Sequence, residues 1–269
     1  MIQLSPDDII LEGMTSINGL FNGIRQGIND RTVRQILVDA SRKDKKYSEF
    51  SFLRSQSSLF GYELIETDSE TISGLAKGRT HGGVLAVCST RSYSAPDPSS
   101  MVSVRFSALF EGIEDPYNFG SCLRSLYAFG AQSILVPDVH IPFADGIICK
   151  SSAGASEMLP IYEFDPMQAV SLFKANGFKI VCANIRDSVP LEEADLSFPV
   201  LLVLGGEKRG ISRALLDAAD INVRIDYAVP FRGSLGTAPA TAILAHAISM
   251  ANKKSSKEVF PNGSETKKV

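Results

Sequence analysis

The sequence predicts an α/β fold built on a parallel sheet, because short apolar segments alternate with segments of helical periodicity after residue 103. The strand candidates in this part of the chain are residues 104–110, 133–136, 178–183, 200–204 and 223–226. The second and fourth are nearly all apolar, which is typical of strands buried on both faces of a parallel sheet. In such a sheet, ligands bind where strands end in loops at the carboxyl edge.

Two helices in this part of the chain have recognisable ends. Asp165 and Pro166 have the residue types of an N-cap and a first helical position, and Gly177 is a stop signal for the helix that they begin. The last helix is expected over residues 238–252, which are rich in Ala, Ile and Leu. Pro239 falls in its first turn, where a missing N–H group is tolerated.

The chain is expected to divide into two domains. Residues 91–101 hold two prolines and four serines without periodicity, which indicates a linker. The expected parts are a first domain over 1–95, a linker over 96–103, a second domain over 104–252 and a disordered polar tail over 253–269. In the first domain, apolar residues at helical spacing after Gly13 predict a helix, and residues 33–38 and 84–88 predict strands.

The composition excludes several functional classes. With 27 basic and 30 acidic side chains and a formal charge of −3, the chain could bind nucleic acid only at a local patch. Four cysteines and three histidines are scattered without metal-ligand spacing, which predicts reduced core thiols and no metal. Acidic residues near the N-terminus, and the lack of any apolar run of about 20 residues, predict a soluble, cytoplasmic protein without a signal peptide.

One local basic patch lies in the first domain. Four cations fall within five positions: Arg42, Lys43, Lys45 and Lys46. Such a cluster is either a solvated loop or a contact surface for RNA phosphates, and the sequence leaves both interpretations open.

The segment of residues 118–130 carries polar groups at the start of a helix. It follows the first strand of the second domain, and apolar residues recur at helical spacing up to Gly130. The amide of Asn118 and the guanidinium of Arg124 suit the binding of a hydroxyl or a phosphate. The alternative is an ordinary surface helix with one arginine on its polar face.

Residues 204–211 form a glycine-rich loop at the end of an apolar strand. Gly205 and Gly206 allow close approach to the backbone and expose its N–H groups. The loop lacks the G-x-G-x-x-G spacing of a dinucleotide-binding turn, and Glu207 would repel a pyrophosphate. It therefore suits a neutral or cationic ligand, such as a sulfonium, while an ordinary glycine-rich turn is the alternative.

A third loop, residues 228–242, leads into the last helix. Its residues are mostly small, so another chain segment or a cofactor is expected to pack closely against it. The N-terminus of the following helix offers free N–H groups with a partial positive charge.

Together the three loops resemble the three motifs of the SpoU/TrmH family of the SPOUT superfamily. The matching residues are Asn118-x-Gly120-x-x-x-Arg124 with Phe129 and Gly130, Gly205-Gly206-Glu207-x-x-Gly210, and Pro230 followed by Gly233-Ser234-Leu235. Residues 150–155 also resemble the family. The first 95 residues are similar to the substrate-binding domain of many members, which has the fold of a small RNA-binding ribosomal protein; Gly13 and residues 78–86 mark its ends.

The resemblance implies an S-adenosylmethionine-dependent methyltransferase that acts on a ribose 2′-hydroxyl of structured RNA, with ribosomal RNA favoured over transfer RNA. It also implies a deep trefoil knot in the last third of the catalytic domain and a homodimer, neither of which composition could show. The expected fold class is thus a knotted parallel-sheet SPOUT methyltransferase domain preceded by a small α/β substrate-binding domain.

The resemblance also assigns residues to roles. The expected cofactor-binding residues are Leu204, Gly205, Gly206, Val229, Pro230 and Leu235. The expected catalytic residues are Arg124, Asn118, Glu207 and Ser234. Contacts to substrate RNA are expected not from the resemblance but from the basic cluster Arg42, Lys43, Lys45 and Lys46, together with Arg79.

Arg124 is expected to act as a cation, because a free guanidinium has a pKa of about 12.5–13.8 and is a poor base. It would orient the ribose or the adjacent phosphate and stabilise developing alkoxide charge. Asn118 and Ser234 would hydrogen-bond the ribose or Arg124. Glu207 would either pair with Arg124 or face the positive charge of a sulfonium.

The third motif departs from the family pattern. Gly233 joins Ser234 directly, and Gly236 stands where the family has an asparagine. The loop has lost a hydrogen-bonding amide, which Thr237 replaces in part, so the change bears on catalytic efficiency and substrate more than on cofactor binding. Two other classes stay open: an RNA-binding or assembly protein with a retained cofactor pocket and little transferase activity, and a nucleotide-binding α/β protein of other chemistry.

Overall fold

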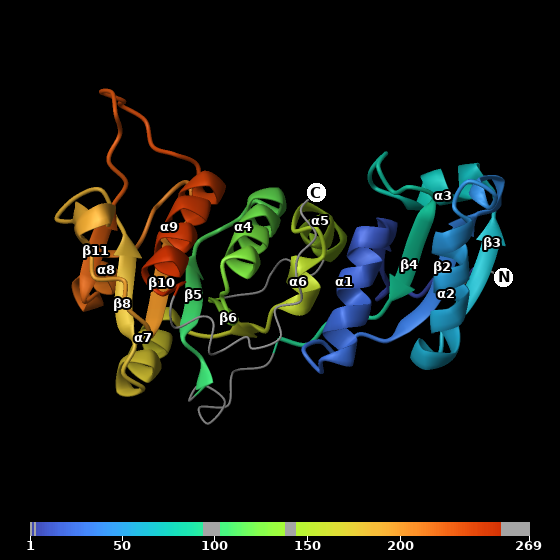
Figure 1. The fold of residues 1–269 in the computed structure, drawn as a ribbon, viewed down its shortest axis with the longest axis horizontal. Helices are drawn as coiled ribbons and strands as arrows, with labels where there is room; N and C mark the ends of the chain where they lie inside the picture. Colours follow the sequence, from blue (N-terminus) through green and yellow to red (C-terminus); the bar gives the residue numbers. More distant parts are fainter. Residues whose placement is uncertain (1, 3, 94–102, 138–143, 254–269) are drawn as a thin grey trace. The chain divides into compact units, whose positions relative to one another are not determined.

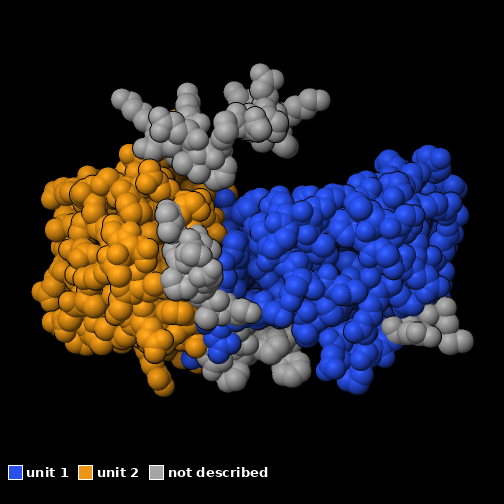
Figure 2. Space-filling view, turned by 90° about the horizontal axis from the view of Figure 1, so that it is seen from below, with its two compact units in different colours: residues 1–95, 114–127, 138–163 blue, residues 96–113, 128–137, 164–269 orange. Residues whose placement is uncertain are grey.

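The computed structural model describes residue 2 and residues 4–93, 103–137 and 144–253. These residues form two compact units, shown in Figure 2. The first comprises residues 1–95, 114–127 and 138–163, and the second comprises residues 96–113, 128–137 and 164–269. Almost all of the expected linker (96–103) and all of the expected tail after Lys253 lie outside the described residues.

A four-stranded sheet forms the centre of the first unit. Its strands are β1 (Ile9–Glu12), β2 (Val33–Asp39), β3 (Glu63–Thr67) and β4 (Val84–Cys88), in the order β1-β4-β2-β3. β4 runs antiparallel to both of its neighbours, and β3 runs parallel to β2. The further elements of this unit are α1 (Gly13–Arg25), η1 (Ala40–Arg42), α2 (Tyr47–Phe60), α3 (Ser69–Leu75), α4 (Pro116–Ala128), α5 (Asp145–Ser151), α6 (Ala155–Met158) and β7 (Ile161–Glu163).

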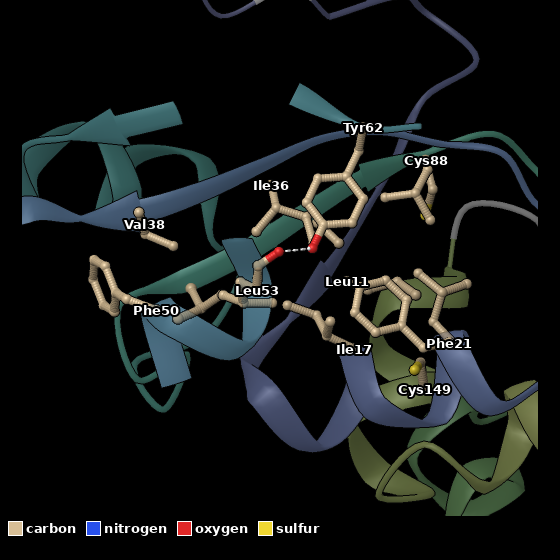
Figure 3. Packing of buried hydrophobic residues seen from close by; sticks show 14 residues of the cluster. Leu11, Ile17, Phe21, Ile36, Val38, Phe50, Leu53, Tyr62, Cys88 and Cys149 are labelled. Atoms are coloured by element: carbon tan, nitrogen blue, oxygen red, sulfur yellow. Dashed lines mark hydrogen bonds between the residues drawn. The ribbon is translucent and has the colours of Figure 1, made fainter. Parts of the chain in front are cut away.

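The hydrophobic core of the first unit is drawn in Figure 3. The ring of Phe21 on α1 is stacked on Phe60, with ring centroids 4.2 Å apart, and on Tyr62 at 5.8 Å. Tyr62 brings a hydroxyl into this apolar environment and donates a hydrogen bond of 2.5 Å to the carbonyl oxygen of Leu53. Its polar atom is thereby satisfied, as a buried hydroxyl requires.

Glycines allow α1 to lie directly against α5 and α6. A Cβ on Gly19 would stand 2.5 Å from the carbonyl oxygen of Gly154, and one on Gly23 would stand 1.9 Å from that of Glu157. Neither distance leaves room for a side chain. Gly154 lies in residues 150–155, the segment that resembles the SpoU/TrmH family. Its φ of +81° is a second reason why glycine is required at this position.

A buried ionic network links the same segments within the first unit. Arg31 donates to the carboxylates of Asp145 at 2.7 Å and Glu157 at 2.8 Å, and the exposure of all three side chains is 3% or less. Burial opposes the charge of Arg31, but the carboxylates of Glu157 and Asp145 raise the pKa of its guanidinium above the usual value. Asn29 donates to the Glu157 carbonyl oxygen at 3.0 Å, which completes the network.

A parallel sheet forms the second unit (Figure 1). Its strands follow the order β6 (Ser133–Val136), β5 (Phe106–Glu111), β10 (Val200–Gly205), β8 (Lys179–Ala183), β11 (Ile221–Arg224) and β9 (Val189–Pro190). Every pair among them is parallel. The other elements are α7 (Pro166–Ala175), η4 (Leu191–Glu193), α8 (Arg213–Ala218) and α9 (Thr237–Ala251). α7 and α8 pack against β8, and α9 packs against β10.

The predicted parallel sheet is confirmed, and several elements match closely. β4 and β6 have the expected bounds, and α7 begins as predicted, with the Asp165 side chain accepting from the Gln168 N–H. The first predicted strand begins later, at Phe106, and β11 begins earlier, at Ile221. None of the described helices is long and apolar enough to span a bilayer.

The two compact units do not coincide with the expected domain ranges. Residues 114–127 and 138–163 belong to the same compact unit as the first 95 residues. The glycine contacts and the Arg31 network join Asp145, Gly154 and Glu157 to that part of the chain. The division into a substrate domain and a methyltransferase domain, and the trefoil knot, stay predictions.

Candidate active site

A cavity of about 310 Å³ lies at the carboxyl edge of the sheet in the second unit. The loops that follow β8, β10 and β11 line it, together with the first turns of α9. This is the edge at which parallel strands deliver ligand-binding loops. Apolar side chains such as Ile185, Ile211 and Leu244 line it alongside polar ones such as Asn184. A cavity with apolar walls and a few polar groups suits a ligand of nucleoside type.

The end of β10 and the loop that follows it contribute Leu204, Gly205, Gly206 and Glu207 to the cavity, as the sequence predicted for this region. Packing within the chain itself explains why glycine is required in this loop. A Cβ on Gly205 would stand 2.4 Å from the Gly210 carbonyl carbon, and one on Gly206 would stand 1.9 Å from the carbonyl oxygen of Gly112. The loop thus needs glycine in order to fold, whether or not a ligand approaches its backbone.

The loop before α9 brings Ser234 and Leu235 to the same cavity. Tyr227, at the start of this loop, also lines it, and its hydroxyl oxygen accepts a hydrogen bond of 3.0 Å from the Leu235 N–H. Val229 and Pro230 are exposed and are absent from the described lining of the cavity, so their role in binding stays a prediction.

Sequence reasoning missed three contributors to the cavity: Tyr227, Arg224 and the loop after β8 that begins at Asn184. Arg224 donates from Nε to the Asp226 carboxylate at 2.8 Å and from Nη1 to the Ser188 carbonyl oxygen. The alternation of strands and helices could have indicated the loop after β8, because all strands of a parallel sheet end at the same carboxyl edge.

Asn118 and Arg124, the other two predicted catalytic residues, lie on α4 of the first unit. Arg124 is exposed, and the backbone N–H of Asn118 donates to the Asp115 carboxylate at 2.8 Å. Gly120 of the same motif has a packing explanation, because a Cβ there would stand 1.9 Å from Ser151 Oγ. The four predicted catalytic residues thus fall on two units, and their joint action stays a prediction.

The basic cluster of the first unit is largely paired with carboxylates. Arg42 contacts Asp39 at 3.0 Å, Lys43 contacts Glu66 at 2.9 Å and Lys46 contacts Glu49 at 2.8 Å. Lys45 and Arg79 are exposed. The patch is therefore less positive than four adjacent cations suggest, and its role in RNA binding stays a prediction.

The thiols fit the interpretation made from the sequence. All four cysteines are free and buried. Burial raises the pKa of Cys182, which lies on β8, to about 12. Such thiols are inert as nucleophiles at neutral pH. Over the described residues, no group of three or more potential ligands could hold a metal ion.

Comparison with known proteins identifies the family. The model of the SpoU rRNA methylase family matches residues 105–246. The chain is 26% identical over 208 residues to the 23S rRNA (guanosine-2′-O-)-methyltransferase RlmB of Bordetella pertussis, covering 76% of this chain and 82% of that protein. It is 24% identical over 231 residues to RlmB of Coxiella burnetii, covering 83% of this chain and 86% of that protein.

Solved structures share the fold. An AdoMet-bound rRNA methyltransferase from Sinorhizobium meliloti superposes with a TM-score of 0.73 at 20% identity, over 92% of this chain and 88% of that one. The SpoU methyltransferase AviRb from Streptomyces viridochromogenes, in complex with AdoMet, gives a TM-score of 0.71 at 22% identity, over 92% and 91%.

The parallel sheet with its carboxyl-edge cavity therefore has the fold of RNA methyltransferases. The chain belongs to the SpoU rRNA methylase family, since the family model covers more than half of its residues. The family predicted from the three loops is confirmed.

Proposed function

We propose that this protein transfers the methyl group of S-adenosylmethionine to the 2′-hydroxyl of a ribose in ribosomal RNA. The observation that carries the proposal is the cavity at the carboxyl edge of the second unit, lined by the second and third family motifs. The names of the relatives agree with it: the Bordetella and Coxiella proteins are 23S rRNA (guanosine-2′-O-)-methyltransferases.

The residues of the cavity fit this cofactor. Leu204, Gly205 and Leu235 offer backbone groups to an adenosyl moiety, and the loop around them is fixed by its own hydrogen bonds, including the one between Tyr227 and Leu235. Glu207 lines the cavity and places a carboxylate there, which could face a cationic sulfonium. The cofactor, when bound, supplies an electrophilic methyl group.

The chain's own residues would align the acceptor and stabilise charge. Alignment of donor and acceptor in one complex contributes up to about 7–11 kcal/mol in well-oriented systems. Arg124 would hold the ribose or its phosphate with a planar, bidentate cation and stabilise the oxygen as its proton leaves. Asn118 and Ser234 would hydrogen-bond the same acceptor. These roles rest on the motif positions of the family.

The remaining parts of the proposal concern partners. Residues 1–95 would recognise the RNA, and two copies of the chain would form a homodimer. The exposed apolar side chains of Val229 (67% exposed) and Phe231 (58%), beside the cavity loop, support a partner surface there. A ribosomal RNA substrate implies a cytoplasmic enzyme.

Two measurements test the proposed function. Calorimetry with S-adenosylhomocysteine should detect one site per chain, and transfer of a labelled methyl group to unmodified, transcribed 23S rRNA should yield a 2′-O-methylnucleotide at one position. Base methylation, or methylation of transfer RNA alone, would contradict the proposed substrate. Failure to bind the cofactor would contradict the proposal as a whole.

The second candidate is an RNA-binding or assembly protein with little transferase activity, and Gly236 is the observation that favours it. A Cβ at this position would meet only the Pro239 Cδ atom, at 3.8 Å, and its φ of −59° suits any residue. Gly236→Asn should therefore fold and restore the amide that the family carries. Robust turnover by the wild type would exclude the second candidate, whereas turnover seen only in Gly236→Asn would support it.

A further inference from the structure

A second cavity, of about 350 Å³, lies within the first unit. Four segments that are far apart in the sequence line it: the start of α1, the residue before α2, the loop before β4 and the α5 region. It contains Lys46 and Lys150, and it opens at the N-terminus of α1, whose N–H groups carry a partial positive charge. The proposed methyl transfer makes no use of this cavity.

The two lysines keep hydrogen-bonding capacity for a ligand. Lys46 pairs with Glu49 at 2.8 Å and Lys150 pairs with Glu12 at 2.5 Å, whereas an ammonium group has three donors. The Glu12 carboxylate also accepts from the N–H groups of Lys77, at 2.6 Å, and Gly78, at 3.1 Å. Glu12 is thus engaged by the protein itself and holds the Lys150 ammonium in place.

Glycines bring the backbone of the loop beside both ammonium groups. A Cβ on Gly78 would stand 2.4 Å from Lys150 Nζ, and one on Gly82 would stand 3.3 Å from Lys46 Nζ. Gly82 also has a φ of +63°, which disfavours other residues. Glycine at positions 78 and 82 therefore leaves room for the ammonium groups of Lys150 and Lys46. A larger side chain at either position would displace the neighbouring ammonium group.

His81 lies between these glycines and lines the cavity. It is only 8% exposed, and its Nδ1 atom accepts a hydrogen bond of 3.1 Å from the Gly83 N–H. The proton of the neutral ring must therefore reside on Nε2, which becomes a donor. Within the described part of the chain, no partner accepts from Nε2.

We propose that this cavity binds a phosphodiester group of the RNA substrate, between Lys46, Lys150 and His81 at the N-terminus of α1. The group has the matching chemistry: one negative charge, and oxygens that accept from two ammonium groups, one imidazole and the helix N–H groups. The inference rests on the proposed function, because that function supplies RNA as the partner.

This site revises the set of RNA contacts expected from the sequence. Lys46 remains because it lines the cavity, whereas Arg42 and Lys43, which pair with Asp39 and Glu66, are absent from its lining. Lys150 is added from a segment that follows Lys46 by more than a hundred residues. No cluster of charges in the sequence pointed to it.

Charge removal tests the site in the full-length protein. Lys46→Met and the double variant Lys150→Met/Glu12→Gln, which avoids leaving a buried unpaired carboxylate, should each bind unmodified 23S rRNA about 5- to 10-fold more weakly at moderate salt. The slope of log K against log salt should fall by about 0.7–0.9 for each lysine removed. Lys174→Met is the control and should change neither quantity, because this exposed lysine of the second unit pairs with Asp220 at 3.2 Å and lies in neither cavity.

The histidine gives an independent readout. In full-length protein labelled with ¹⁵N-histidine, inorganic phosphate should shift the His81 Nε2 resonance and leave that of His246 unchanged, and His81→Phe should weaken binding of the rRNA. An unchanged salt slope in both lysine variants would overturn the proposal. A phosphate shift at His81 with normal rRNA binding by the variants would also overturn it, since the site would then serve a free anion. Cofactor calorimetry on the same variants should be normal, so a loss of cofactor binding would point to the proposed function and not to this site.

Discussion

The two cavities proposed to bind ligands differ in how the chain builds them. The cavity of the second unit consists of loops at the ends of neighbouring parallel strands, and it uses backbone groups and small residues. The cavity of the first unit combines the start of α1 with lysine and histidine side chains from three other, distant segments. Motif spacing predicts the first kind of site, because its residues are local in sequence. The second kind is visible only after the segments have packed.

The units also differ in what supports each cavity. In the first unit, α5 and α6 are held by buried charges and by glycine contacts. In the second unit, main-chain hydrogen bonds support the cavity loop, such as that from the Gly206 N–H to the Glu111 carbonyl oxygen at 2.7 Å. Substitutions in the buried network of the first unit should therefore lower its stability without changing cofactor binding by the second unit.

The largest expected effect follows from removal of Arg31. Arg31→Met would leave the buried carboxylates of Asp145 and Glu157 without their cation, which typically costs about 3–5 kcal/mol. Native-state hydrogen exchange should show the amides of α1 and α6 opening that much more readily, while cofactor affinity in calorimetry stays normal.

The pH dependence of this variant has a definite sign. Burial raises the pKa of Asp145, so a proton stabilises the folded form once Arg31 is gone. The variant should regain stability as pH falls from 8 toward 5. The triple variant Arg31→Met/Asp145→Asn/Glu157→Gln is the control and should lose this dependence. Normal protection of α6 in Arg31→Met would show that the network contributes little to stability.

The same contrast explains how much the sequence could predict. The apolar strand β6 and the capped helix α7 were predicted because hydrophobic pattern and N-cap chemistry are local signals. α2 was missed, since it is rich in serine and buries only Phe50 and Leu53. β3 was also missed, because three of its five residues are polar, and charged Glu63 and Glu66 break the apolar pattern.

The candidate sites show the same limit. The sequence located the loops at Gly205 and Leu235, and the structure brings both to one cavity. The sequence could not show that Gly205 and Gly206 are required because their backbone packs directly against Gly210 and Gly112. Nor could it associate Lys150 with Lys46, because that proximity depends on the packing of α5 within the first unit.

A smaller but still large effect is expected at Arg124, and it concerns rate alone. Loss of one preorganised donor to developing charge costs about 2.7–4 kcal/mol in the transition state. Arg124→Ala should therefore lower single-turnover methyl transfer by about 10²–10³-fold, with normal affinity for S-adenosylhomocysteine. Arg124→Lys keeps the charge without the planar fork and should restore only part of the rate.

The lysine variant decides between two roles for this residue. If Arg124→Lys were as fast as the wild type, a bidentate contact would be excluded. If Arg124→Ala retained full turnover, Arg124 would have no part in the mechanism. The exposed Arg54 on α2 offers the control, since Arg54→Ala should leave the rate unchanged.

The smallest effect is expected at Tyr227, and it tests how the third loop keeps its shape. The Tyr227 hydroxyl oxygen accepts from the Leu235 N–H, and its ring contacts Phe231 edge-on with centroids 5.8 Å apart. Tyr227→Phe retains the ring and removes only the hydrogen bond, whose net contribution is about 0.5–1.5 kcal/mol. Cofactor affinity should therefore fall by about 2- to 10-fold, with a higher KM for the cofactor and an almost unchanged kcat. Tyr47→Phe, an exposed tyrosine of the first unit, should bind the cofactor normally. An affinity for Tyr227→Phe within the error of the wild type would mean that the backbone of the loop holds Leu235 in the cavity of the second unit without the tyrosine hydroxyl.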